Sequence, residues 1–290
     1  MPELPEVEIT ARLLDATLAG TQIEYARAPG INALRTFDPP LSALEGARLA
    51  AVRRRGKHLI VDFERGGDAP LQLALLMHLM SAGRLQLYDK PAGPRDRTSR
   101  MLLGFADGRE LRLREFGSKQ AAWVKLLPAE ELERDDALAT LGPEAWPDPG
   151  TPAELKVLLD APRPLHALLR DQHVIAGIGR SWVDEILWQA KLSPYKRGAD
   201  LDEGEAERLR NAVRETLGGA IAHYEQAVSL PIPDKLPMPL RIHRHQGEPC
   251  PRCDAPLQAV HFEDYVIAYC PTCQTDGRVL KDRRLSRLLR

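Results

Sequence analysis

Apolar residues recur at helical spacing near the start of the chain and at shorter intervals afterwards. The first pattern opens with Pro5 and stops at Gly20, so it predicts a helix over this stretch. From about Gln22 to Leu127, short apolar runs alternate with turn signals such as Asp107-Gly108, as is typical of antiparallel strands. The clearest predicted strands are Leu59–Phe63, Leu71–Leu76, Gly83–Tyr88 and Met101–Phe105. The first half therefore predicts a leading helix and an antiparallel β-sandwich or barrel.

In the second half, apolar residues recur at the three- to four-residue spacing of helices. The predicted helices are Pro152–Asp160, Leu165–Arg170, Ser181–Lys191 and Asp202–Ala227. A stretch rich in proline, glycine and acidic residues, from Pro128 to Pro152, has the composition of a linker. These changes predict domains at residues 1–127, 151–240 and 241–290, with a linker at 128–150. The expected fold class is α+β with several domains.

The composition argues against a membrane protein. The chain has 290 residues, and no apolar run approaches the roughly 18–20 residues that a membrane span needs. With no secretory signal peptide in view, a soluble cytoplasmic protein is expected. The net charge of −1 gives no overall indication of nucleic acid, but basic residues cluster at Arg53–His58 and from Arg278 to Arg290. Each cluster fits either a solvated face or a surface that binds phosphate.

All four cysteines stand in the last fifty residues, as two pairs with two residues inside each pair and sixteen between the pairs. This spacing allows four thiolates to surround one tetrahedral Zn²⁺. Disulfides are the less favoured alternative because a reducing cytosol keeps thiols free, and a redox site needs one such pair rather than two. The predicted ligands of one structural zinc are Cys250, Cys253, Cys270 and Cys273. No other cysteine remains as a nucleophile.

The N-terminal segment holds a candidate nucleophile. If Met1 is removed, Pro2 presents a secondary amine, and an α-amino group with a pKa of roughly 7.7–8.0 is partly unprotonated at neutral pH. Attack of this amine on a sugar C1′ gives an iminium ion that acts as an electron sink. Glu3 then serves as the general acid for the sugar ring oxygen. The alternative is that Pro2 and Pro5 merely start a helix, with Glu3 and Glu6 complementing its dipole.

Several segments occur together in an order that a known family shares. They are Met1–Glu8, Arg54–Ile60, Leu141–Glu144, Gly177–Gly179 followed by Asp184-Glu185, and Gly247–Cys250 ahead of the zinc ligands. Over nearly the whole chain this sequence resembles the formamidopyrimidine-DNA glycosylase / endonuclease VIII family, and its opening octet is more similar to the formamidopyrimidine branch. The resemblance implies an N-terminal β-sandwich domain, a helix–two-turns–helix domain and a C-terminal zinc finger. It also implies base excision from DNA, followed by cleavage of the abasic strand through β,δ-elimination.

The same resemblance implies roles for individual residues. Pro2 is implied as the Schiff-base nucleophile, Glu3 as the proton donor, and Lys57 as a group that contacts phosphate or assists proton transfer near an everted nucleotide. The implied partner is double-stranded DNA with a damaged base or an abasic site, bound by a monomer that is associated with the nucleoid. The alternative function is a non-catalytic protein that binds damaged DNA and retains the fold.

Two residues depart from the family pattern where it contacts phosphate. Arg180 follows the glycine turn at the position where the family has asparagine, and it is still expected to bind DNA. Tyr265 stands where the family has the arginine of the zinc finger, and tyrosine offers no permanent cation and no bidentate fork. These departures concern strand binding rather than the N-terminal chemistry.

The side chains that fill the DNA void are a further expectation. Met80, Arg114 and Phe116 are the candidates, although other alignments put Ser81 and Gly117–Lys119 at these positions.

Open alternatives concern three residues of one predicted helix. Glu185 is expected either to orient the backbone or Pro2, or to be an ordinary carboxylate of a helix face. Trp182 and Trp188 are expected in the core rather than as surfaces that stack on bases.

Overall fold

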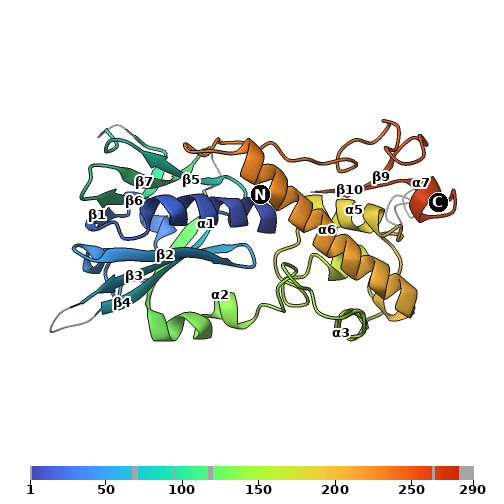
Figure 1. Cartoon of the computed structure of the whole chain (residues 1–290), viewed down its shortest axis with the longest axis horizontal. Helices are drawn as coiled ribbons and strands as arrows, with labels where there is room; N and C mark the ends of the chain where they lie inside the picture. The colour runs from blue at the N-terminus through green and yellow to red at the C-terminus, as the bar shows by residue number, and fades with distance from the viewer. Residues whose placement is uncertain (1, 67–70, 94–95, 117–119, 263–264, 281–290) are drawn as a thin grey trace. The chain divides into compact units, whose positions relative to one another are not determined.

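The computed structural model describes residues 2–66, 71–93, 96–116, 120–262 and 265–280 (Figure 1). The backbone divides into two compact units, which we describe separately. Unit 1 comprises Met1–Thr140 with Ile221–Pro237, and unit 2 comprises Leu141–Ala220 with Met238–Arg290. None of the helices in the described part of the chain is long and apolar enough to cross a membrane.

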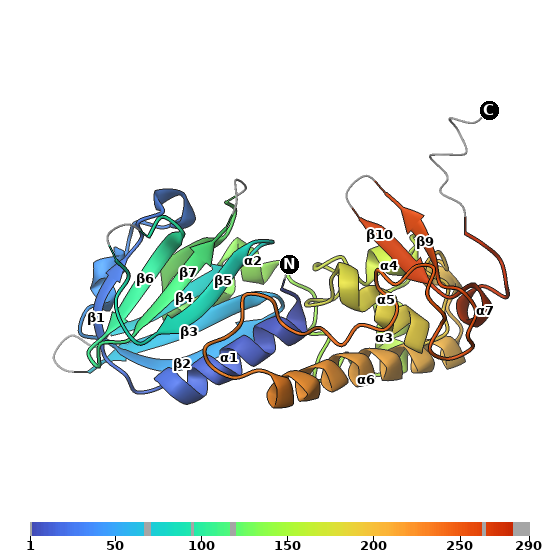
Figure 2. The same ribbon diagram turned by 90° about the horizontal axis from the view of Figure 1, so that it is seen from above.

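Unit 1 contains two antiparallel four-stranded sheets (Figures 1 and 2). The first has the order β1 (Ile23–Arg27), β6 (Ser99–Phe105), β7 (Glu110–Glu115) and β5 (Gly83–Tyr88). The second has the order β2 (Arg48–Arg55), β3 (His58–Arg65), β4 (Leu71–His78) and β8 (Trp123–Pro128). The predicted strand over Gly83–Tyr88 is β5 with the same bounds, and the other three predictions lie within β3, β4 and β6. The predicted β-sandwich is confirmed.

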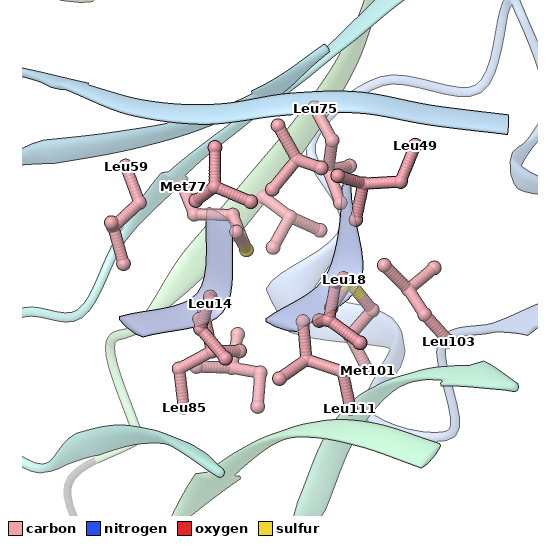
Figure 3. Close-up of a cluster of buried hydrophobic side chains, with 14 of the residues drawn as sticks. Leu14, Leu18, Leu49, Leu59, Leu75, Met77, Leu85, Met101, Leu103 and Leu111 are labelled. Carbon is pink, nitrogen blue, oxygen red and sulfur yellow. The ribbon is translucent and has the colours of Figure 1, made fainter. Parts of the chain in front are cut away.

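Helix α1 (Leu4–Leu18) supplies part of the core between the sheets. Leu14 and Leu18 project between leucine and methionine side chains from both sheets, and both are fully buried (Figure 3). Burying a leucine side chain contributes about 1.5–3 kcal/mol, so this face fixes the helix against the sandwich. The helix is followed by Gly20 at φ +83°, whose N–H donates to the Leu49 carbonyl 2.8 Å away. Glycine adopts this left-handed conformation without a Cβ clash, which explains the predicted stop.

The predicted linker at 128–150 carries short helices in its first part. They are the 3₁₀ helix η3 (Ala129–Arg134) and helix α2 (Asp136–Ala139). Lys125 on β8 binds the carboxylate of Asp135 at 2.7 Å, and Asp135 also accepts a hydrogen bond from the Ala137 N–H at the start of α2. This segment is therefore tied to the second sheet of unit 1. Unit 1 also has two earlier 3₁₀ helices, η1 (Ile31–Ala33) and η2 (Leu41–Leu44).

Unit 2 combines helices with a small two-stranded sheet. Its elements are α3 (Pro152–Leu158), α4 (Leu165–Leu168), α5 (Arg180–Gln189), η4 (Gly198–Asp200), α6 (Glu203–Ala227), β9 (Gln258–His261), β10 (Val266–Tyr269) and α7 (Pro271–Gln274). Residues of α6 up to Ala220 belong to unit 2, and those from Ile221 belong to unit 1. The four predicted helices are all present, with ends that differ by one or two residues. Trp182 and Trp188 are buried, as predicted.

Candidate functional site

The N-terminal segment of unit 1 is held by a buried carboxylate. The Glu3 N–H donates to Oε2 of Glu6 at 2.8 Å, and the Tyr224 hydroxyl donates to Oε1 of the same carboxylate at 2.6 Å. Glu3, Glu6 and Tyr224 are 2%, 4% and 0% exposed. Burial, reinforced by the Glu6 carboxylate, raises the pKa of Tyr224, so its hydroxyl stays protonated and donates. Glu6 therefore fixes the backbone at Glu3, immediately after Pro2.

From the sequence, Glu6 was expected only to complement the dipole of a helix. A glutamate in the first turn of a helix is expected to complement the helix dipole, and nothing nearby in the chain predicts a second function. Its partner Tyr224 lies 218 residues away in the sequence. A contact of this kind forms only when the last turns of α6 close onto the start of α1 within unit 1.

Contacts between α1 and β2 show which end of unit 1 carries Pro2. Glu8 binds Arg54 at 2.6 Å, and Asp15 accepts from the Val52 N–H at 2.7 Å. The helix and the strand therefore run in opposite directions, so the start of α1 lies at the end of β2. The hydrogen bonds and charges of Arg54 and Arg12 outweigh the effect of burial and lower the pKa of Glu8, which keeps this connection charged at neutral pH.

Lys57 lies in the two-residue turn that follows β2. Gly56 has φ +56° in this turn, and its carbonyl accepts a hydrogen bond from Arg54 Nη1 at 3.4 Å. Lys57 is only 6% exposed, which is unusual for a lysine and keeps its side chain among protein groups. Because Arg54 also binds Glu8 on α1, the turn with Lys57 lies at the same end of unit 1 as Pro2.

Two histidines and a tryptophan occupy the strand ends next to Lys57. The His58 and His78 rings are 4.8 Å apart, and the Trp123 ring stacks on His78 with centroids 5.9 Å apart. Burial lowers the pKa of His58 to about 4. Burial, together with the charges of His58 and Lys57, lowers the pKa of His78 to about 3. Both rings are therefore neutral at pH 7.

The connection between β4 and β5 carries Met80. Its backbone has φ +49°, and its N–H donates to Nδ1 of His78 at 3.0 Å. The Gly83 N–H donates to the Leu79 carbonyl at 2.8 Å, which closes the turn. A Cβ at Gly83 would lie 2.4 Å from that carbonyl oxygen, so only glycine fits. Met80 is half-buried, and Ser81 is the exposed residue of the turn.

Arg114 and Phe116 lie at the end of β7, which pairs with the start of β5 through Glu115 and Gly83. The Arg114 guanidinium donates to Thr98 Oγ1 at 2.9 Å and to the Tyr88 hydroxyl at 2.6 Å, so it lies along the sheet. Phe116 is 41% exposed, an unusual environment for a phenylalanine.

Glu115 holds the backbone that leads into β8. The N–H groups of Ala121 and Ala122 both donate to Glu115 Oε1 at 2.8 Å. The alternative positions Gly117–Lys119 lie outside the described residues.

One end of unit 1 thus gathers most of the predicted residues of this unit. Pro2 and Glu3 reach it from α1, Lys57 from the β2–β3 turn, Met80 from the β4–β5 turn, and Phe116 from the end of β7. Arg114 lies beside Phe116, with its guanidinium carbon 4.6 Å from that ring, and it donates hydrogen bonds to Thr98 and Tyr88. Arg180 and the cysteines belong to unit 2. Met1 lies outside the described residues.

The four cysteine sulfurs of unit 2 form a compact cluster. All four lie within 4.8 Å of one another, with Sγ–Sγ distances of 3.5 Å for Cys253–Cys270, 3.5 Å for Cys253–Cys273 and 4.0 Å for Cys250–Cys273. A tetrahedron of thiolates at about 2.3 Å from zinc has edges of ~3.8 Å, whereas a disulfide needs about 2.05 Å. The cysteine set fits one structural Zn²⁺, and the disulfide alternative does not fit.

Helix α5 holds the segment before the zinc ligands. Glu185 Oε1 accepts hydrogen bonds from the N–H groups of Arg241, Ile242 and His243, at 3.1, 2.9 and 2.9 Å. The neighbouring Asp184 binds His243 Nδ1 at 2.7 Å through Oδ2. Glu185 therefore orients backbone, which is one of the alternatives that the sequence left open.

Trp188 connects the same helix directly to the zinc ligands. Its indole N–H donates to Cys250 Sγ at 3.4 Å, and the Arg252 guanidinium lies 4.1 Å from its ring centroid. Hydrogen bonds to a ligating sulfur orient it and tune its basicity.

Three domains of known protein families match the chain in order. The formamidopyrimidine-DNA glycosylase N-terminal domain matches residues 1–118, the formamidopyrimidine-DNA glycosylase H2TH domain matches 141–231, and a zinc finger found in FPG and IleRS matches 247–275. The last match contains all four cysteines.

Relatives and solved structures agree with these domains. Proteins named formamidopyrimidine-DNA glycosylase from Geobacillus kaustophilus and Thermus thermophilus are 32% and 33% identical, over 94% and 96% of this chain and 100% of each relative. Structures of the Lactococcus lactis Fpg with DNA containing N7-benzyl-Fapy-dG or an abasic site have TM-scores of 0.82 and 0.81 at 26% identity. Each covers 94% of this chain, and the chain covers 100% and 99% of them. The chain therefore belongs to the formamidopyrimidine-DNA glycosylase family.

Proposed function

We propose that this protein excises a damaged base from double-stranded DNA through a Schiff base on Pro2 and then cleaves the abasic strand as a lyase. The observation that carries the proposal is the fixed N-terminal segment. A buried carboxylate, Glu6, holds the Glu3 backbone at the end of unit 1 where Lys57 also lies. The relatives favour this enzyme over a non-catalytic protein that binds damaged DNA.

The proposed chemistry begins with the amine of Pro2 after removal of Met1. Its lone pair attacks C1′ of the damaged nucleotide, and the N-glycosidic bond breaks with its electrons passing to the base. The amine proton passes to the departing base, and Glu3 gives a proton to the ring oxygen as the sugar opens, which leaves a cationic iminium. The iminium accepts the electron pair of the C2′–H bond as that proton leaves. The resulting enamine returns the pair, and the 3′ phosphate departs with the electrons of the C3′–O bond.

The other proposed roles follow from position. Lys57, buried beside two neutral histidines, binds a phosphate or assists proton transfer near the everted nucleotide. Met80 and Phe116 enter the space left in the duplex, and Arg180 binds the strand. We keep Arg114 as a candidate that first has to leave its contacts with Thr98 and Tyr88.

The domains have corresponding proposed roles. Residues 1–127 form the catalytic domain, 128–150 the linker, and 151–240 together with 241–290 the region that binds DNA. The zinc ligands keep the finger folded and take no part in the chemistry.

Borohydride trapping tests the proposed reaction. The protein is incubated with duplexes that carry an abasic site, an oxidised base or an alkylated base, and borohydride reduces any iminium to a stable covalent adduct. We expect an adduct whose mass places the DNA on the N-terminal residue, together with strand cleavage in unreduced reactions. The absence of an adduct on every duplex would refute the proposed enzyme.

Two variants give the controls. Pro2→Gly removes the secondary amine and is expected to lose the adduct. A variant with an uncleaved N-terminal extension keeps Pro2 but blocks its nitrogen, and it is also expected to form none while binding abasic DNA normally. Adduct formation by the blocked protein would exclude Pro2 as the nucleophile.

A further inference from the structure

Two arginines of unit 2 converge on one tyrosine ring. The Arg170 guanidinium carbon lies 4.4 Å from the centroid of the Tyr265 ring, and that of Arg180 lies 5.2 Å from the same centroid. Phe262 stacks on Tyr265 with centroids 4.5 Å apart and an interplanar angle of 3°. A single ring thus has two cations within the distance of a cation–π interaction.

Each member of this cluster is held by contacts of its own. Gln172 Nε2 donates to the carbonyls of Arg170 and Ile178, both at 2.8 Å, and its Oε1 accepts from the Gly177 N–H at 2.9 Å. The segments that carry Arg170 and Arg180 are therefore tied together by one side chain. The Phe262 N–H donates to the Tyr265 carbonyl at 2.9 Å, which fixes the ring at the end of the β9–β10 pair.

Two permanent positive charges lie near the ring. Two guanidiniums near one ring repel each other, and the negative face of the ring offsets only part of that repulsion. Burial lowers the pKa of His166; Asp184 opposes this shift, and the charges of Arg170 and His243 add to it. The His166 ring, which stacks beside Tyr265, is therefore neutral at pH 7. Among the described residues, no carboxylate forms an ion pair with Arg170.

We propose that Arg170 and Arg180, oriented by Tyr265, together bind one phosphodiester group of the DNA strand. This inference rests on the proposed function and extends it to Arg170, which the sequence did not indicate, and to Tyr265, to which the sequence assigned no role of its own. Guanidinium groups present several N–H donors in a plane, which matches the oxygens of a phosphate. Tyr265 is a positioning residue, since it holds both cations by its ring and donates no charge to the phosphate.

Binding measurements test the proposal without any chemistry. The probe is a duplex with a tetrahydrofuran abasic analogue, which has no aldehyde for a Schiff base, and fluorescence anisotropy gives Kd between 50 and 400 mM salt. Arg170→Gln is expected to raise Kd by about tenfold at low salt and to reduce the slope of log K against log salt by about 0.9. The matched control is Arg208→Gln, which removes the same charge from an exposed position on α6.

Two changes at Tyr265 separate positioning from folding. Tyr265→Phe keeps the ring and is expected to bind as the wild type does. Tyr265→Leu removes the ring and is expected to weaken binding. Adding Arg170→Gln to Tyr265→Leu is expected to raise Kd by a smaller factor than Arg170→Gln does in the wild type. Zinc content and thermal unfolding of each variant show that the finger is folded.

The outcomes distinguish this site from the proposed reaction. Equal Kd values and salt slopes for Arg170→Gln and Arg208→Gln would overturn the phosphate site, and normal binding by Tyr265→Leu would overturn the role of the ring. Failure of borohydride trapping in the wild type would refute the reaction while leaving these binding results unchanged. If the reaction stands, Arg170→Gln still forms the Pro2 adduct at saturating DNA.

Discussion

The hydroxyl of Tyr224 offers the sharpest test of how the N-terminal segment is positioned. Tyr224→Phe keeps the buried ring and removes the donor that lies 2.6 Å from Oε1 of Glu6. The Glu6 carboxylate retains its hydrogen bond from the Glu3 N–H at 2.8 Å. The change therefore loosens the group that fixes the residue after Pro2, without touching Pro2 or Glu3.

The magnitude follows from the kind of bond. A hydrogen bond to a charged group contributes about 1.5–3 kcal/mol to stability. The missing hydroxyl oxygen also leaves a small cavity, which lowers the free energy of unfolding by less than about 1 kcal/mol. We expect the free energy of unfolding to fall by about 2–3 kcal/mol. A misplaced nucleophile also reacts more slowly, so we expect the rate of adduct formation at saturating DNA to fall by roughly ten- to a hundredfold.

A second tyrosine of unit 1 provides the control. The Tyr25 hydroxyl donates to Glu110 at 2.5 Å, and Glu110 also accepts from the Ala92 N–H at 2.7 Å. Burial and the Glu110 carboxylate raise the pKa of Tyr25 to about 12, so the same chemical change is made in both variants. Tyr25→Phe is expected to lower stability but to leave the rate of adduct formation unchanged, because Tyr25 lies on β1, which pairs with β6, and its hydroxyl does not bind Glu6.

Urea unfolding and single-turnover borohydride trapping measure the two effects separately. The reasoning is refuted if Tyr224→Phe forms the adduct as fast as Tyr25→Phe does. A loss of stability below about 0.5 kcal/mol would show instead that the hydroxyl does not bind a charged carboxylate.

Three further predictions concern the zinc site, the helix that supports it and the histidines. Cys270→Ser is expected to lose the single bound zinc, measured by metal analysis, and to shift the fluorescence of Trp188, which donates to Cys250. Glu185→Ala leaves three backbone N–H groups without their acceptor and is expected to cost more than about 3 kcal/mol in urea unfolding, whereas a loss near zero would contradict the role of Glu185. His58 has a folded pKa of about 4, below the unfolded value near 6.5, so the unfolded state binds more protons between these values. Stability is therefore expected to fall from about pH 6.5 to 4, and His58→Phe, compared by urea unfolding across this range, is expected to flatten part of that fall.

The sequence predicted the elements of this protein better than it predicted their contacts. Local signals decide where a strand or a helix begins and ends, and Asp107-Gly108 and the glycine at position 20 are signals of this kind. The cysteine spacing was sufficient to predict the zinc ligands, because four thiolates on two short turns can surround one ion. The stretch after Pro128 was harder to interpret, since its acidic and proline-rich composition does not show that Asp135 binds Lys125 on a strand.

The site illustrates the same limit. Sequence and resemblance indicated Pro2, Glu3 and Lys57, but Glu6 and Tyr224 are 218 residues apart and only the closed fold brings them together. Glu185 had two open interpretations until its three backbone partners were located around Ile242. Residues that hold other residues in place are therefore the ones that the sequence misses, because their function is defined by a distant contact and not by their own type.

Tyr265 shows how such contacts change the meaning of a substitution. From the sequence, tyrosine at this position removes a cation from the finger, and the change suggests weaker binding of the strand. In the fold, the ring lies beside two guanidiniums, from Arg170 and Arg180, so this region of unit 2 keeps positive charge that comes from other segments. The number of cations near a phosphate therefore depends on which segments converge there. Arg170 lies in a turn after α4, far from the zinc finger in the sequence. A comparison of zinc-finger motifs would therefore not identify it.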